Sequence, residues 1–94
     1  MNKITYEERR EVYQKALETW GERAQTMMAI EEMSELIKEI CKNFRGRPND
    51  DAIAEEIADV TIVLEQLRVI YGLNERVCEH MDQKIQRLRD RLGM

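Results

Sequence analysis

The segment DAIAEEIADVTIVLEQLRVIY, residues 51–71, is the most apolar part of the chain and decides its fold. Its apolar residues recur at the three- and four-residue spacing of an α-helix, on more than one side. One stripe contains Ile53, Ile57, Val60, Leu64, Leu67 and Tyr71, and a second contains Ala54, Ala58, Ile62 and Val69. A helix that is apolar on two sides is buried by more than one neighbour. We therefore expect this helix to be central, with one stripe against its own chain and the other against a partner subunit.

Two carboxylates interrupt this helix at the edge of its first stripe. Glu56 and Asp59 lie three residues apart, so both project from one helix face, where we expect them to be partly desolvated. A similar pair, Glu32 and Glu35, lies in the earlier segment EEMSE, residues 31–35. Packed face to face, the two helices would form a four-carboxylate cage, which needs a counter-charge. Oxygen-only ligands favour Mg²⁺ or Mn²⁺ over zinc.

The three-residue spacing is common in this chain, so its context matters. The chain has 19 acidic residues, and four acidic pairs are three residues apart. The first and last pairs, Glu8/Glu11 and Glu79/Asp82, have basic neighbours and are expected on solvated faces. The pair within residues 56–59 lies in an apolar helix, where acids are rarely buried unless they are paired or metal-bound.

Helical patterns also precede residues 51–71. Thr5 followed by Glu8 is a capping-box pattern that opens a helix through about Thr19, and Trp20-Gly21 ends or bends it. A second helix is expected over residues 22–44. The apolar side of the first helix contains Val12, Ala16 and Leu17, with Tyr13 beside them. The apolar stripe of the second contains Met33, Ile37, Ile40 and Phe44, widened by Ile30 and Leu36. Its adjacent side contains Gln25, Met28, Glu32, Glu35 and Glu39.

Turn signals separate the remaining helices. Gly46 and Pro48 stop the second helix, and one of the residues 49–51 caps the third. Gly72 is a good C-cap and Asn74 a good N-cap for a fourth helix over residues 75–92. The fourth helix has an apolar stripe containing Val77, Met81, Ile85, Leu88 and Leu92, flanked by a basic row containing Arg76, His80, Lys84, Arg87 and Arg91. Such a row either holds a metal-bound polyanion or is solvated, and for Arg76 and Arg91 we favour the solvated interpretation.

The composition agrees with an all-α fold. The chain of 94 residues forms one domain, residues 1–94, and contains 36% charged and 43% apolar residues with only four Gly and one Pro. A core of this size is marginal alone, so homo-oligomerisation is expected. The net charge of −4 argues against nucleic acid as the main partner. Cys41 and Cys78 are expected to be reduced core thiols. Without a signal region or a membrane-spanning apolar run, we expect a cytoplasmic protein with no membrane association.

Both acidic motifs resemble those of the MazG-like all-α nucleoside triphosphate pyrophosphohydrolases, which combine Glu-Glu-x-x-Glu with a later Glu-x-x-Asp. The motifs here are Glu31-Glu32-Met33-Ser34-Glu35 and Glu56-Ile57-Ala58-Asp59. The similarity also includes Trp20-Gly21, Gln25, Glu35-Leu36-Ile37, Ala58-Asp59-Val60 and Lys84-Ile85-Gln86-Arg87, so it extends from Trp20 to Leu92. Asp82 is a departure, because similar sequences often carry Asn shortly before the Lys.

The resemblance implies a four-helix, MazG-like fold and Mg²⁺-dependent hydrolysis of a nucleoside triphosphate between its α and β phosphates, giving the monophosphate and pyrophosphate. Glu32, Glu35, Glu56 and Asp59 would hold the metal, and one of them, for example Glu35, would accept the proton of the attacking water. The resemblance further implies that Lys84 and Arg87 hold phosphate oxygens, that Trp20, Gln25 and Met28 form a base pocket, and that the chain is a homodimer or homotetramer.

Two other functions stay open at this point. A phosphoribosyl-ATP pyrophosphohydrolase would have the same fold and metal site. A non-catalytic helical interaction protein would carry the acids as a charged surface, with no Mg²⁺-dependent stability. A di-iron bundle is a poor fit, because it needs Glu-x-x-His pairs and the only histidine, His80, follows Val77 at that spacing.

Overall fold

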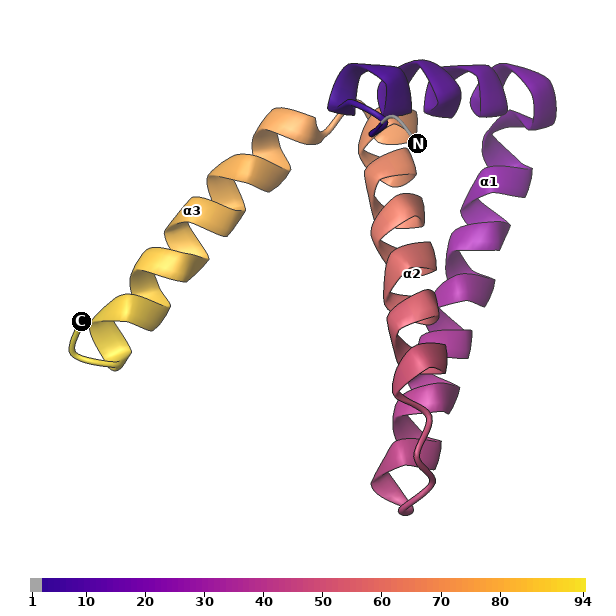
Figure 1. The fold of residues 1–94 in the computed structure, drawn as a ribbon. Helices are drawn as coiled ribbons and strands as arrows, with labels where there is room; N and C mark the ends of the chain where they lie inside the picture. Colours follow the sequence, from indigo (N-terminus) through magenta and orange to yellow (C-terminus); the bar gives the residue numbers. More distant parts are fainter. Residues whose placement is uncertain (1–2) are drawn as a thin grey trace.

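The structure, a computed structural model, describes residues 3–94 and contains three α-helices. The helices are α1 (Tyr6–Phe44), α2 (Asp50–Tyr71) and α3 (Asn74–Arg91), as Figure 1 shows. Residues 3–94 contain no β-strand. The prediction of an all-α fold is therefore confirmed.

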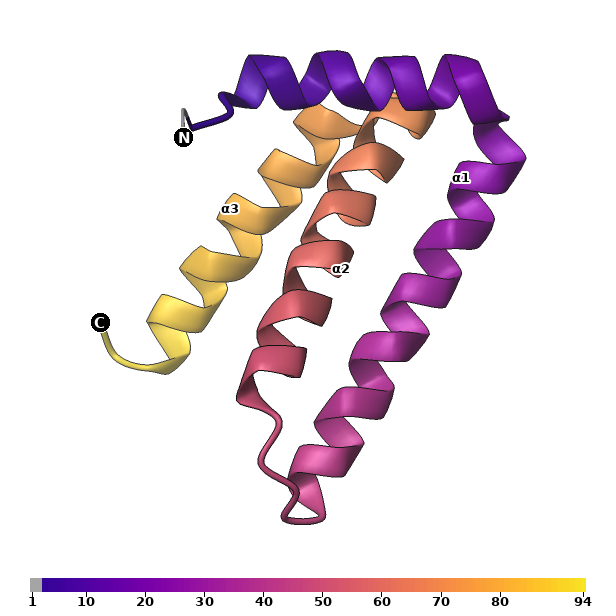
Figure 2. The same cartoon turned by 45° about the vertical axis from the view of Figure 1, so that its right-hand side comes forward.

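α1 is bent at Gly21 into two arms, the first arm being residues 6–20 and the second arm residues 22–44. Gly21 has φ 87° and ψ 161°, a conformation that residues with a Cβ rarely adopt. The first arm crosses the end of α2, and the second arm runs antiparallel to α2 (Figure 2). The two arms are the first and second helices expected from the sequence, and Trp20-Gly21 bends the chain rather than ending a separate element.

The predicted caps are confirmed at Thr5 and Gly72 but not at the start of α3. The Glu8 N–H donates to the Thr5 hydroxyl at 3.1 Å, and Gly72 ends α2 in the left-handed conformation with φ 63°. Asn49 occupies the N-cap of α2, but its side chain caps nothing and donates instead to the Glu39 backbone oxygen at 2.9 Å and carboxylate at 3.2 Å. Asn74 is the first residue of α3, not its cap. These contacts fix the loop between α1 and α2.

The packed interior is small and lies between the first arm, the second arm and α2. The buried residues are Tyr13, Ala16, Gln25, Ala29 and Val63. Ala29 permits close approach of the second arm to α2, because its side chain is a single methyl group. This interior lacks a large, fully buried side chain within the described part of the chain, so a single chain has little core to stabilise it.

The predicted apolar sides are only partly the packing sides. Val12 is exposed while Tyr13 is buried, and in the second arm Ile37 and Phe44 are 62% and 91% exposed. On α2 the buried residue is Val63, which belongs to neither predicted stripe. The second arm packs through positions 25, 29, 32 and 36, at the four- and three-residue spacing of a helix pair, and of these positions only Leu36 belongs to the predicted stripe. Most of that stripe is exposed, at Ile37, Ile40 and Phe44.

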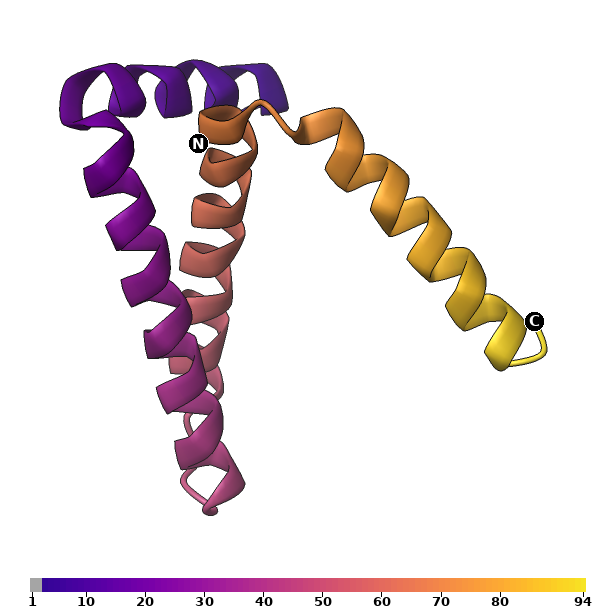
Figure 3. The same ribbon diagram turned by 180° about the vertical axis from the view of Figure 1, so that it is seen from behind.

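α3 projects away from the other helices (Figures 1 and 3). Its backbone comes close to α2 alone, and none of its residues is buried. A four-helix bundle is therefore not closed within residues 3–94. The predicted apolar stripe of α3 is exposed at Met81, Ile85, Leu88 and Leu92.

The structure also tests the predictions about the cysteines and about membrane spans. Cys41 and Cys78 are both free, but they are exposed, so the expectation of core thiols is wrong. Both cysteines lie in segments with helical spacing, but that spacing does not determine which side of the helix faces the interior. In residues 3–94, each helix is too short or too polar to span a lipid bilayer.

Candidate metal centre

Three of the four predicted carboxylates converge between the second arm of α1 and α2. One carboxylate oxygen from each of Glu32, Glu56 and Asp59 lies within 4.8 Å of the other two. All three residues are half-buried. We call this set the acidic triad. In the described residues it is the one group of three or more potential metal ligands at such distances.

Helix packing explains why the triad forms. Glu32 follows the buried Ala29 by three residues, and Asp59 precedes the buried Val63 by four, so each acid lies one turn from the interior on the same helix face. Glu56 lies a further turn along that face of α2. The sequence suggested that the acids lie at the edge of an apolar stripe. In the structure they lie on the packing face itself.

The electrostatics of the triad are unfavourable for three ionised acids. Burial raises the pKa of Glu32, and the negative charges of Asp59, Glu35 and Glu31 raise it further. Burial also raises the pKa of Glu56, with added repulsion from its acidic neighbours. The Glu56 Oε2 atom is buried and has no hydrogen-bond partner. The two ion pairs found in residues 3–94 both lie elsewhere, so no lysine or arginine neutralises the triad.

The donor set fits a hard divalent cation. Ligand atoms of an octahedral Mg²⁺ ion are about 3.0 Å apart when adjacent and about 4.2 Å apart when opposite, since each bond is about 2.1 Å. The triad oxygens lie within 4.8 Å of one another, so binding would draw the three side chains closer together. The unpartnered Glu56 oxygen is the kind of buried acceptor that a cation satisfies. Three carboxylates leave other positions of an octahedral ion for water or phosphate.

Glu35 stands apart from the triad. It is exposed and is not among the three carboxylates that share the 4.8 Å separation. Its charge is still close enough to raise the pKa values of both Glu32 and Glu56. Glu35 therefore lies beside the triad rather than within it.

The predicted base-pocket residues do not form one pocket in a single chain. Gln25 is 2% exposed, and neither its amide nitrogen nor its amide oxygen has a hydrogen-bond partner. It lies two turns before Glu32 on the packing face of the second arm. Trp20 is 63% exposed and lines a separate hollow on the first arm, and Met28 is also exposed. The bend at Gly21 separates Trp20 from the second arm's packing face.

The predicted phosphate-binding residues also lie apart from the triad. Lys84 and Arg87 are exposed on α3, where they line a hollow with Leu88 and Arg91. Because the α3 backbone does not approach α1, one chain alone does not bring Lys84 and Arg87 to the triad.

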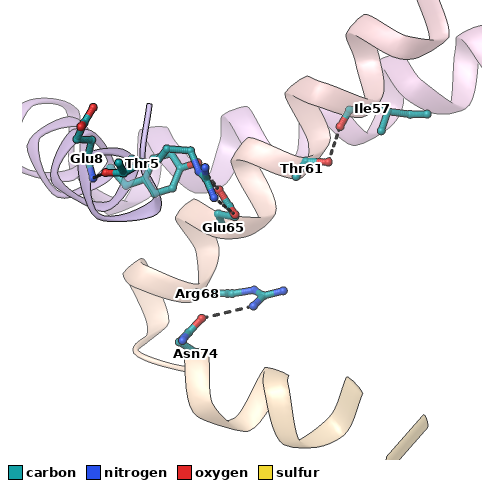
Figure 4. A network of polar contacts seen from close by, with 9 residues as sticks. Thr5, Glu8, Ile57, Thr61, Glu65, Arg68 and Asn74 are labelled. Carbon is teal, nitrogen blue, oxygen red and sulfur yellow. Dashed lines mark hydrogen bonds and ion pairs between the residues drawn. The ribbon is translucent and has the colours of Figure 1, made fainter. Parts of the chain in front are cut away.

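A partly buried polar network was not predicted from the sequence. Glu65 of α2 points toward the first arm of α1 (Figure 4), where Tyr13 and Arg9 donate to its carboxylate, the Arg9 Nε atom at 3.2 Å. Burial would raise the pKa of Glu65, but these hydrogen bonds outweigh it, so the pKa lies below its ordinary value. Burial and the Glu65 contact raise the pKa of Tyr13 to about 12. The available signal was that Glu65 is the only acid in residues 60–71, the more apolar half of α2.

The geometry defines an all-helical protein with a three-carboxylate cluster between two antiparallel helices. Comparisons with protein-family models, with curated proteins and with solved structures found no match for the chain.

Proposed function

We propose that this chain is a Mg²⁺-dependent nucleoside triphosphate pyrophosphohydrolase of the MazG-like type. The observation that carries the proposal is the convergence of Glu32, Glu56 and Asp59 from two helices. These are three of the four acids that the motif resemblance assigns to metal binding. The unpartnered oxygen of Glu56 supports it further, because a structural acid in that position would be expected to have a donor.

In the proposed reaction, water attacks the nucleoside triphosphate and the bond between the α and β phosphates breaks. The products are the nucleoside monophosphate and pyrophosphate. Glu32, Glu56 and Asp59 would hold Mg²⁺, with Mn²⁺ as a substitute, and a bound ion would neutralise phosphate charge and lower the pKa of water. Glu35 is the proposed base, since it lies beside the triad and its carboxylate is exposed and free to take the proton of the water.

The proposal includes a second copy of the chain as partner, in a homodimer or homotetramer. Exposed apolar residues on the second arm and α3 support this, because the interior of a single chain is very small. In such an assembly α3 of one copy would bring Lys84 and Arg87 to the triad of another, where they would hold phosphate oxygens. Gln25 would offer its unpartnered amide to the nucleotide, with Trp20 and Met28 completing the pocket from the assembled copies. The proposed setting is the cytoplasmic nucleotide pool.

Pyrophosphate release tests the proposal. The purified chain is mixed with Mg²⁺ and a panel of ribo-, deoxyribo- and damaged nucleoside triphosphates, with phosphoribosyl-ATP included. We expect release with at least one substrate, and loss of at least ~100-fold in Glu56→Gln, because the triad loses a ligand. Glu55→Gln is the matched control, since Glu55 is the exposed neighbour on the same helix and is outside the triad. Full activity in Glu56→Gln contradicts the ligand assignment.

A helical interaction protein without catalytic activity is a second candidate, favoured by the same exposed apolar residues. It differs from the enzyme in the role of the triad. An interaction protein would show no Mg²⁺-dependent stabilisation and no release of pyrophosphate from any substrate in the panel.

A further inference from the structure

A second, positively charged site lies at the turn between α2 and α3. Here the first arm of α1, the end of α2 and the start of α3 border an open hollow of about 490 Å³, which we call the elbow hollow. Its lining includes Arg10 and Gln14 from α1, Arg68 from α2, and Asn74 and Arg76 from α3. The volume lies within the range of about 300–1,000 Å³ that is typical of small-molecule sites.

None of the three arginines of the elbow hollow forms an ion pair within residues 3–94, although the positive charge of Arg68 lies close enough to Glu65 to help lower the pKa of that carboxyl. Both ion pairs in residues 3–94 involve other cations. The Arg68 hydrogen bonds go to neutral groups. Arg68 donates to the Asn74 side-chain oxygen at 3.4 Å (Figure 4) and to the Met81 sulfur at 3.6 Å. The lining contains one acid, Glu75, so three positive charges and one negative charge leave a formal +2.

The elbow hollow thus concentrates positive charge on a chain whose net charge is −4. Like charges that share a hollow repel each other, and an anion of matching charge relieves that repulsion. Guanidinium groups present paired N–H donors that suit the oxygens of phosphate. The first turn of α3 adds to this, because Leu73 at the N-cap offers no side-chain acceptor to the first N–H groups of the helix.

We infer that the elbow hollow binds a phosphate group, with Arg10, Arg68 and Arg76 as the contacting residues. Arg68 is nine residues beyond Asp59 on α2, about 13 Å along the helix axis, so this site is separate from the acidic triad. The inference does not depend on the proposed enzymatic function. The phosphate is either inorganic or the phosphate of a nucleotide, since both present the same oxygens to the arginines.

An NMR titration of the full chain tests the inference. Inorganic phosphate, pyrophosphate, AMP and adenosine are added separately in the presence of EDTA, so that no divalent cation recruits an anion to the triad. We expect saturable amide shifts at Asn74, Glu75 and Arg76 with the phosphate-bearing probes. Tighter binding of AMP than of inorganic phosphate identifies a nucleotide as the source, and the reverse order identifies the inorganic ion. Equal binding of AMP and adenosine, or shifts matched by NaCl at the same ionic strength, overturns the inference.

Substitutions separate the hollow from general charge effects. Arg10→Gln and Arg76→Gln are each expected to weaken phosphate binding about tenfold, because each removes a charge-assisted hydrogen bond. Both side chains are exposed, so the fold should be unaffected. Arg10→Lys is expected to keep part of the affinity. Arg89→Gln is the matched control, since this substitution removes the same charge from α3 at a position outside the hollow. Equal weakening by the control and the Arg76 variant overturns the inference.

Discussion

Glu32→Gln is expected to change the stability of the protein in opposite directions with and without Mg²⁺. In the metal-free protein, the Glu32 carboxylate has two acidic neighbours within 4.8 Å, each repelling it by about 0.9 kcal/mol at the dielectric constant of water. The bulk-water value applies because Glu32 is partly exposed, and salt at about 0.15 M roughly halves it. Removing the charge should therefore stabilise the metal-free protein by about 1 kcal/mol.

Mg²⁺ reverses the order of the two proteins. Free Mg²⁺ at about 100 times its Kd stabilises a folded protein by about 2.7 kcal/mol, and each kcal/mol raises Tm by about 4–8 °C in a domain of this size. The wild-type protein should gain about 10 °C or more. The variant should start several degrees higher and gain little, because its triad has lost a ligand.

Thermal melts followed by circular dichroism, in EDTA and in MgCl₂, measure both effects. Glu31→Gln is the matched control, since it removes the adjacent exposed charge outside the triad. The raised pKa values of Glu32 and Glu56 also make the free energy of unfolding depend on pH. Both carboxyls hold their protons more tightly in the folded protein than in the unfolded chain. In the metal-free protein, the part of the stability that depends on these two carboxyls should be fully present below their ordinary pKa and should be lost as pH rises through the raised values. An equal Mg²⁺ gain in variant and wild type would refute the reasoning.

Four further substitutions test other parts of the structure by chemical denaturation or ultracentrifugation. Glu65→Gln should cost about 1–2 kcal/mol at pH 7. Because the pKa of Glu65 is lowered on folding, that difference should shrink as pH falls through the folded pKa. Gly21→Ala should cost about 1–2 kcal/mol, because φ 87° strains a residue with a Cβ, although the added methyl group meets no neighbour. Gln25→Leu should stabilise the protein by about 1 kcal/mol or more, since it removes two unpartnered amide atoms, and should weaken triphosphate binding if that amide contacts the nucleotide. Ile37→Asp should shift the proposed oligomer toward monomer in sedimentation velocity, while Lys38→Asp, on a neighbouring position, should not.

The helices and their breaks were predictable because the signals are local. Thr5, Gly21 and Gly72 act within a few residues of where they stand, so the cap, the bend and the left-handed turn follow from the sequence. The exposed sides were not predictable in the same way. Ile37 and Phe44 are as apolar as any core residue, and only the position of α2 decides that Ala29 faces inward instead.

The same distinction between local signals and helix packing applies to the candidate site. Glu56 and Asp59 share a helix, so their common face follows from their spacing, whereas the meeting of Glu32 with them depends on how two helices pack. Glu35 is three residues after Glu32, yet it is exposed and does not join the group. The Arg9, Tyr13 and Glu65 network could not be found from spacing at all, since Arg9 and Glu65 are 56 residues apart in the chain.

The interface between the second arm and α2 contains the orphaned buried polar atoms of residues 3–94, on Gln25 and Glu56. A helix pair selected for stability alone would place apolar residues at these positions, because an unpartnered buried polar atom costs free energy. Apolar residues are not scarce in this chain, since Ile37 and Phe44 lie exposed on the other side of the same helix. The polar groups therefore occupy the packing face at the expense of stability. An interface arranged this way is explained if its polar atoms gain their partners from a ligand, a cation at Glu56 and a hydrogen-bonding group at Gln25.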